Sequence, residues 1–173
     1  MTISSVSAID TMVKARFNAA DLPRITGSPE YDATNELVKA IEHIATTFKT
    51  KQYGGKCGVL PFIASEDEAR RVTNNNALDS SRAVEPALRN PRITLSTLPK
   101  DEKIINTEHK VALSEYEIVL AVDRYAVATI VANVDKQYIV AKCMDYIGYA
   151  NKTDHTMIVE LMTHLFVINA EKR

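Results

Sequence analysis

The sequence predicts an all-α protein built on one long central helix, because residues 101–132 contain no proline or glycine and show a helical apolar period. Asp101 and Glu102 open this stretch, where negative charge suits the positive end of a helix dipole. Pro99 keeps an upstream helix from running into it. Some 30 residues at about 1.5 Å each make a rod of roughly 45 Å, longer than a small domain is wide. We therefore expect the other elements to pack along it, against Ile105, Ala112, Tyr116, Val119, Val127 and Ile130.

The composition is that of an ordinary globular chain. With 173 residues, of which 46% are hydrophobic and 25% charged, it fits one domain or two small lobes that share the long helix. The two-lobe division places an N-terminal helical lobe with a long irregular loop at 1–99, and the long helix with a C-terminal helical hairpin at 100–173. The net charge of -1 excludes a global electrostatic attraction to nucleic acid.

Cysteine usage and hydropathy predict a cytoplasmic location. Cys57 and Cys143 lie far apart and form no metal-binding pair, which is typical of a reduced, intracellular protein. The sequence has neither an apolar run long enough to span a membrane nor the pattern of a secretory signal at its start. We therefore expect no membrane partner.

Residues 1–51 predict two helices. Ser7 can cap a short first helix that docks on the domain, although such an arm could also be passed to a neighbouring subunit. The expected face of this helix is Ile9, Met12, Val13 and Phe17. Ser28 and Pro29 are typical of an N-cap followed by a first helical residue, which predicts a second helix over 29–51. Its expected buried face is Leu37, Ile41, Ile44 and Phe48.

Residues 52–64 predict a glycine-rich loop. Gly54, Gly55 and Gly58 favour a turn over a phosphate-binding loop, because no Lys-Ser or Lys-Thr pair follows and no strand precedes them. Residues 59–63 could add a short extended segment. Ser65 and Glu68 then form a capping box, which predicts a short helix to about residue 73.

Residues 77–99 predict the longest irregular segment. It carries three prolines and no clear period, and a loop of this length in a compact domain is usually functional or mobile. We expect its arginines on solvent or on a neighbouring subunit. Together with three lysines, they form a candidate RNA-binding patch: Lys49, Lys51, Lys56, Arg82, Arg89 and Arg92.

The C-terminal part predicts two more helices. Asp135 can cap one that ends near Ile147, with Gly148 at its C-terminal end. Thr153 can cap the last one, whose wide apolar face predicts burial. Those apolar residues are Met157, Ile158, Leu161, Met162, Leu165 and Phe166.

The sequence contains no recognisable catalytic constellation. The four histidines form no HxxxH pair, and the acid pairs Glu66/Glu68 and Glu115/Glu117 lie at i, i+2, on different helix faces. No nucleophile with an obvious basic partner is present. We therefore predict that the protein is not an enzyme and takes no metal, cofactor or small-molecule substrate.

A series of short motifs carries a resemblance over about residues 22–168. In order they are ITGSPEY (25–31) with Leu37 and Ile41, the glycines of 54–60, Glu115-Tyr116, AVDRY (121–125), residues 135–138, GYANKT (148–153) and ELMTHL (160–165). This ordered set resembles the N-terminal, capsid portion of Gag-like polyproteins of copia-type (Pseudoviridae-like) retrotransposons of protists. Two features depart from that family: no zinc knuckle is present, and residues 166–169 replace its Tyr-Gly segment.

The resemblance implies an all-helical capsid-like protein that self-associates into shells or filaments. The partner expected first is therefore another copy of the chain, and RNA binding without a zinc knuckle is the alternative. The near-neutral charge agrees with a shell-forming part rather than an RNA-packaging part. The residues predicted to pack in the core or between subunits are Tyr116, Tyr138, Ile158, Leu161 and Leu165.

Overall fold

The computed structural model describes residues 7–52, 55–64, 66–74, 84–87, 92–94 and 96–137. Within these ranges the chain is helical and contains no sheet, which confirms the all-α prediction. The elements in order are α1 (Ala8–Ala19), α2 (Tyr31–Thr46), the 3₁₀ helix η1 (Gly55–Cys57), α3 (Leu60–Ile63), α4 (Glu66–Thr73) and α5 (Pro99–Asn133). A single isolated parallel bridge pairs Ile25 with Val134.

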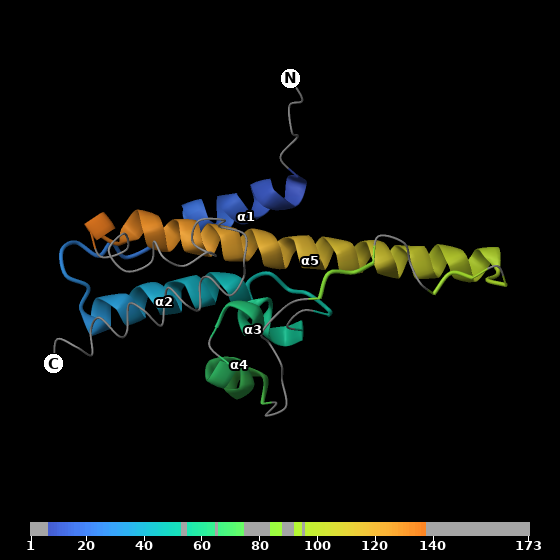
Figure 1. Cartoon of the computed structure of the whole chain (residues 1–173), viewed down its shortest axis with the longest axis horizontal. Helices are drawn as coiled ribbons and strands as arrows, with labels where there is room; N and C mark the ends of the chain where they lie inside the picture. Colours follow the sequence, from blue (N-terminus) through green and yellow to red (C-terminus); the bar gives the residue numbers. More distant parts are fainter. Residues whose placement is uncertain are drawn as a thin grey trace, which may run out of the picture.

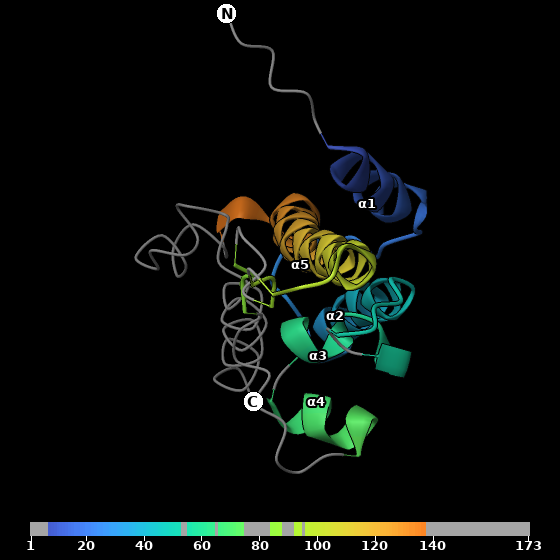
Figure 2. The same cartoon turned by 90° about the vertical axis from the view of Figure 1, so that its right-hand side faces the viewer.

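The long helix α5 is the axis of the fold, and α1 and α2 lie along its C-terminal half (Figure 1). Viewed along α5, α1 lies above it, α2 and α3 lie below it, and α4 lies farthest away (Figure 2). Helix α2 runs antiparallel to α5, so it begins at the end of the molecule where α5 finishes (Figure 1). The prediction of a long central helix is confirmed, and at about 1.5 Å per residue α5 is roughly 52 Å long. It starts two residues earlier than predicted, with Pro99 as its first residue.

Helix α1 begins as the sequence predicts. Ser7 is its N-cap, and the Ser7 hydroxyl accepts a hydrogen bond from the Asp10 backbone N–H at 3.1 Å. Val13 and Phe17 are buried, but Met12 is 42% exposed, so its place on the predicted buried face was wrong. On the inner side of α1, the Asp10 carboxylate accepts a hydrogen bond from the Tyr125 hydroxyl at 2.7 Å and pairs with Arg124. These contacts fix α1 against α5.

Helix α2 is shorter at both ends than the predicted 29–51. Its N-cap is Glu30 in extended conformation, not Ser28, and Thr47 caps its C-terminus. The helix ends earlier than predicted because of a tertiary contact. The Val59 N–H donates a hydrogen bond to the Ala45 carbonyl at 3.2 Å, at the place where a continuing helix would use that carbonyl. The predicted apolar face is nevertheless buried, as Leu37, Ile41, Ile44 and Phe48.

The loop after α2 turns sharply at Gly58, which confirms the turn interpretation for the described residues 55–60. Gly58 has φ +61°, and a Cβ atom there would lie 2.6 Å from the Ala45 carbonyl oxygen. The short extended segment predicted at 59–63 is wrong. Those residues enter helix α3, in which Pro61 occupies the first turn and fixes a helical φ.

The fully buried side chains form one core that joins α1, α2, α3 and α5. The largest are Leu37, Ile41, Ile63, Ile130, Val13, Val59 and Val119. Of the six positions predicted along α5, Ala112, Val119, Val127 and Ile130 are buried, whereas Ile105 and Tyr116 are half-buried. The division into two lobes at residue 99 stays a prediction.

Helix α4 packs on α3 and ends as predicted at Thr73. The Cys57 thiol donates a hydrogen bond to the Val72 carbonyl at 3.3 Å, which ties the turn η1 to α4. Glu68 pairs with Arg71 at 2.5 Å on α4. The capping residue Ser65 lies outside the described residues.

Replacing Glu42 of α2 by glutamine is expected to change how stability depends on pH. Burial, and secondly the charge of Glu68, raises the pKa of Glu42. A carboxyl group with a raised pKa holds its proton more tightly when folded, so it costs the folded state stability as pH rises. The unfolding free energy of Glu42→Gln relative to the unchanged chain, from urea titrations, should therefore increase from about pH 4 to about pH 7.

Glu68→Gln provides the matched comparison. The hydrogen bond from Arg71 lowers the pKa of Glu68, so this carboxylate contributes stability that is present at neutral pH and lost on acidification. Glu68→Gln should therefore be less stable than the unchanged chain at about pH 7, with the difference shrinking toward about pH 4. Parallel pH slopes for the two variants would contradict this account of the Glu42 and Glu68 carboxyl groups.

The predictions for the C-terminal part fall mostly outside the described residues. The Gln137 N–H points to the Asp135 carboxylate at 3.4 Å, as the predicted cap requires. The helices predicted beyond this point, and the packing residues Tyr138, Ile158, Leu161 and Leu165, lie outside the described ranges.

Candidate functional site

The first third of α5 extends past the other helices, and we call residues 99–111 the overhang (Figure 1). The buried residues of α5 begin at Ala112 and continue to Ile130. At about 1.5 Å per residue, the overhang is roughly 20 Å long. Helices α1 and α2 do not reach it (Figure 1).

The overhang and the N-cap residue before it carry an exposed apolar stripe, which we define as Leu98, Ile104 and Val111. Their exposed fractions are 65%, 52% and 41%. Ile104 and Val111 lie seven residues apart, so they share one face of the helix. Farther along, the same face carries the fully buried Val122. The face of α5 that packs on the core near Val122 therefore continues into the overhang, where other residues bury it only in part.

Two hollows lie beside the stripe, between the overhang and the irregular segment that precedes it. The larger, of about 610 Å³, is lined by Lys51, Gln52, Pro86, Ala87, Arg92, Thr107, Glu108, His109, Val111 and Ala112. The smaller, of about 530 Å³, is lined by Arg92, Thr94, Ser96, Thr97, Leu98, Asp101, Ile104 and Ile105. Arg92 stands between them and pairs with Glu108 at 2.7 Å. These hollows leave room beside the stripe for a side chain of a partner.

Glu115 fixes the base of the overhang. This carboxylate is buried, with 6% of the residue exposed, and accepts hydrogen bonds from the backbone N–H groups of Lys51 at 2.6 Å and Gln52 at 3.0 Å. The turn that follows α2 is thereby held against α5 just after the overhang ends at residue 111. A carboxylate that satisfies two backbone donors serves structure rather than chemistry here.

One flank of the overhang is basic. Lys100, Lys103 and Lys110 are exposed, and we call them the lysine flank. None of them has an acid three or four residues away in the helix, the spacing that supports ion pairs along a helix. None forms an ion pair with another residue of the described ranges. The acids of the overhang that border the stripe, Asp101 and Glu108, lie on its other flank.

The candidate RNA-binding patch is only partly visible. Lys49, Lys51 and Lys56 are exposed near the C-terminal end of α2, in the turns that lead to α3. Arg92 is also exposed, but it pairs with Glu108 of its own chain. Arg82 and Arg89 lie outside the described residues. The structure therefore brings the three lysines near one end of α2 and assigns Arg92 to a different contact.

The structure places several of the histidines and acids that the sequence analysis considered. In the described ranges no three side chains of His, Cys, Asp or Glu gather to hold a metal ion. His43 is exposed on α2, and the half-buried His109 borders the larger hollow. Glu115 and Glu117 differ as their spacing predicts, the first buried and the second exposed. No helix of the described part is long and apolar enough to cross a membrane.

The sequence interpretation missed the apolar stripe and the anchor at Glu115. The spacing of seven between Ile104 and Val111 can be read from the sequence. Only the positions of α1 and α2 in the structure show that these two helices do not cover this part of the α5 face. Glu115 reads in the sequence as one of several surface acids. Of the residues predicted to pack, Tyr116 is half-buried against the core.

Comparison with known proteins gives no family assignment. No protein-family model, no curated protein and no solved structure matches the chain.

Proposed function

We propose that this chain is a structural protein that self-associates, and that the overhang of α5 forms the contact. The observation that carries the proposal is the exposed apolar stripe on a rigid helix that extends beyond its own core. Apolar side chains gathered at one exposed place of this kind are typical of interaction surfaces. A copy of the same chain is the partner that the Gag-like resemblance implies, and the retrotransposon origin is part of the same proposal.

The size of the stripe suits repeated weak contacts. Fully burying an exposed Ile or Val side chain contributes about 1.5–3 kcal/mol, so half-exposed Ile104 and Val111 would contribute roughly 1 kcal/mol each. A gain of this size lies well below that of a tight dimer, for which a nanomolar dissociation constant corresponds to about 12 kcal/mol. Assemblies in which each copy makes several such contacts can nevertheless form at high concentration, because the contacts act together.

The double substitution Ile104→Ser/Val111→Ser is expected to prevent association without unfolding the chain. Neither side chain belongs to the buried core, so the melting temperature should change little, whereas the contact loses its apolar centre. The measurement is light-scattering mass as a function of concentration, for the variant beside the unchanged chain. Met12→Ser is the matched control, because Met12 is 42% exposed on α1 and lies away from the overhang.

Association of the double variant equal to that of the unchanged chain would contradict the role of the overhang. The same samples also test the RNA alternative. An unchanged chain that stays monomeric, and binds single-stranded RNA with an affinity that falls steeply with salt, would replace the assembly proposal by nucleic-acid binding.

A further inference from the structure

We infer that the copies join head to tail, with the overhang of one chain on the N-terminal turn of α2 in the next. This inference rests on the proposed self-association and adds the second surface that it uses. The second surface, which we call the acidic patch, consists of Glu30, Tyr31, Asp32 and Glu36.

The acidic patch gathers negative charge at an exposed helix end. Glu30, Asp32 and Glu36 are all exposed, and Tyr31 is 45% exposed. Asp32 lies in the first turn, where its negative charge interacts favourably with the helix dipole, so the dipole explains the presence of this one acid. Asp32 and Glu36 stand four residues apart, however, where like charges destabilise a helix. Lys39, three residues beyond Glu36, supplies one cation on the same helix face, but three carboxylates against one cation leave a net negative charge, which a further cation from outside the helix would offset.

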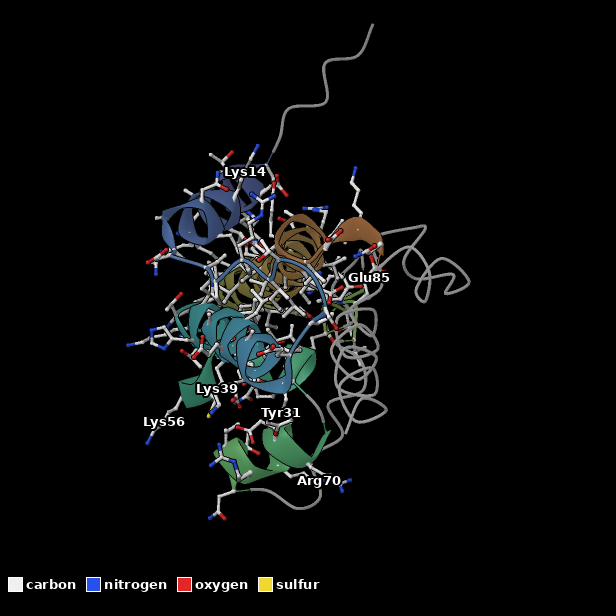
Figure 3. All side chains as sticks on the ribbon, turned by 90° about the vertical axis from the view of Figure 1, so that its left-hand side faces the viewer. Lys14, Tyr31, Lys39, Lys56, Arg70 and Glu85 are labelled. Atoms are coloured by element: carbon white, nitrogen blue, oxygen red, sulfur yellow. The ribbon has the colours of Figure 1, made fainter. Side chains whose placement is uncertain are left out.

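The two surfaces lie at opposite ends of the molecule. Helix α2 begins at the left-hand end of Figure 1, and the overhang forms the right-hand end. Figure 3 looks onto the left-hand end and labels Tyr31 there, at the start of α2. The overhang of a chain therefore cannot reach its own acidic patch, but it can reach that of a second copy placed in line with it.

The surfaces match in charge and in spacing. The lysine flank offers three cations without a described ion-pair partner, and the acidic patch offers three carboxylates. Lys100 and Lys103 lie about one helical turn apart, as do Asp32 and Glu36, so two pairs can form side by side. The exposed part of the Tyr31 ring supplies an apolar surface that can cover Ile104.

A two-fold contact between two overhangs fits less well. In an antiparallel pair that sets Ile104 on Val111, the lysine flanks meet and Lys103 faces Lys110 of the second copy. In a parallel pair, the second α5 would run along the face of Ile104 and Val111 into the space where α1 and α2 lie (Figure 2). Charge disfavours the first arrangement, and the fold itself blocks the second.

A head-to-tail contact has a structural consequence that a two-fold contact lacks. A row of bound copies still presents one unused surface at each of its two ends, so growth continues until a ring closes or a filament forms. The assembly should therefore pass beyond dimers as concentration rises.

Two charge-reversed variants of the full chain test this contact. The first, Lys100→Glu/Lys103→Glu, reverses the two lysines proposed to pair with the patch, and the second, Asp32→Lys/Glu36→Lys, reverses the acidic patch. At low salt, each variant alone should need a concentration at least about tenfold higher than the unchanged chain to associate. The two variants mixed in equal amounts should associate again, and so should one chain that carries all four substitutions.

Light-scattering mass across concentration is the readout, with circular dichroism melts to verify that each variant is folded. Lys14→Glu is the control, because Lys14 is exposed on α1 and belongs to neither surface. If Asp32→Lys/Glu36→Lys associates as the unchanged chain does, head-to-tail contact is overturned while self-association stands. If the unchanged chain stays monomeric at every concentration, both proposals fail. Restoration in the mixture is the result that we expect.

Discussion

Replacing Glu115 by alanine is expected to lower the free energy of unfolding by about 3–5 kcal/mol. The carboxylate is buried and accepts the backbone N–H groups of Lys51 and Gln52, so its removal leaves two donors without their acceptor. The turn after α2 would also lose its attachment to α5 beside the overhang. Urea unfolding followed by circular dichroism measures the loss.

Two further variants make this expectation specific. Glu117→Ala is the matched control, two residues along the same helix and exposed, with an expected change within about 0.5 kcal/mol. Glu115→Gln keeps one side-chain oxygen as an acceptor and should fall between the two alanine variants. Equal stability of Glu115→Ala and Glu117→Ala would show that the carboxylate does not hold the turn.

Replacing Gly58 by alanine is expected to cost about 2–4 kcal/mol of stability. Its φ of +61° is unfavourable for a residue with a side chain, and the new Cβ would lie 2.6 Å from the Ala45 carbonyl oxygen and 2.8 Å from that of Thr46. Both neighbours are backbone atoms at the end of α2, so the clash is relieved only if the helix end or the turn moves. Urea titration again measures the change.

A comparison with Gly27 separates the effect of the positive φ from the effect of the clash. It also has a positive φ, of +75°, but a Cβ there would meet nothing within 4 Å. Gly27→Ala should therefore cost only the backbone term, about 1 kcal/mol. A Gly58→Ala variant no less stable than Gly27→Ala would mean that the turn does not pack against the end of α2 as described.

The sequence was most informative where local signals and tertiary packing agree. Residues 101–132 carry a helical period without a breaker, and α5 contains all of them. Ser7 precedes an apolar face, and it caps α1. In both places the backbone satisfies its hydrogen bonds within the same segment that the pattern identifies.

The sequence was misleading where a residue from a distant segment forms a hydrogen bond with a backbone group of the predicted helix. The predicted second helix ran to residue 51, yet Val59 binds the Ala45 carbonyl and Glu115 binds the N–H groups of Lys51 and Gln52. Both partners come from outside the segment, so no local pattern could reveal them. The overhang was missed for the same reason, because the exposure of Ile104 depends on where α1 and α2 lie.

The most direct test of the account is the light-scattering mass of the unchanged chain over a wide concentration range at low salt. The monomer has a mass of 19.2 kDa. We expect the measured mass to rise with concentration beyond that of a dimer, and the mass of Ile104→Ser/Val111→Ser to remain at 19.2 kDa. A mass of 19.2 kDa for the unchanged chain at every concentration would contradict self-association through the overhang.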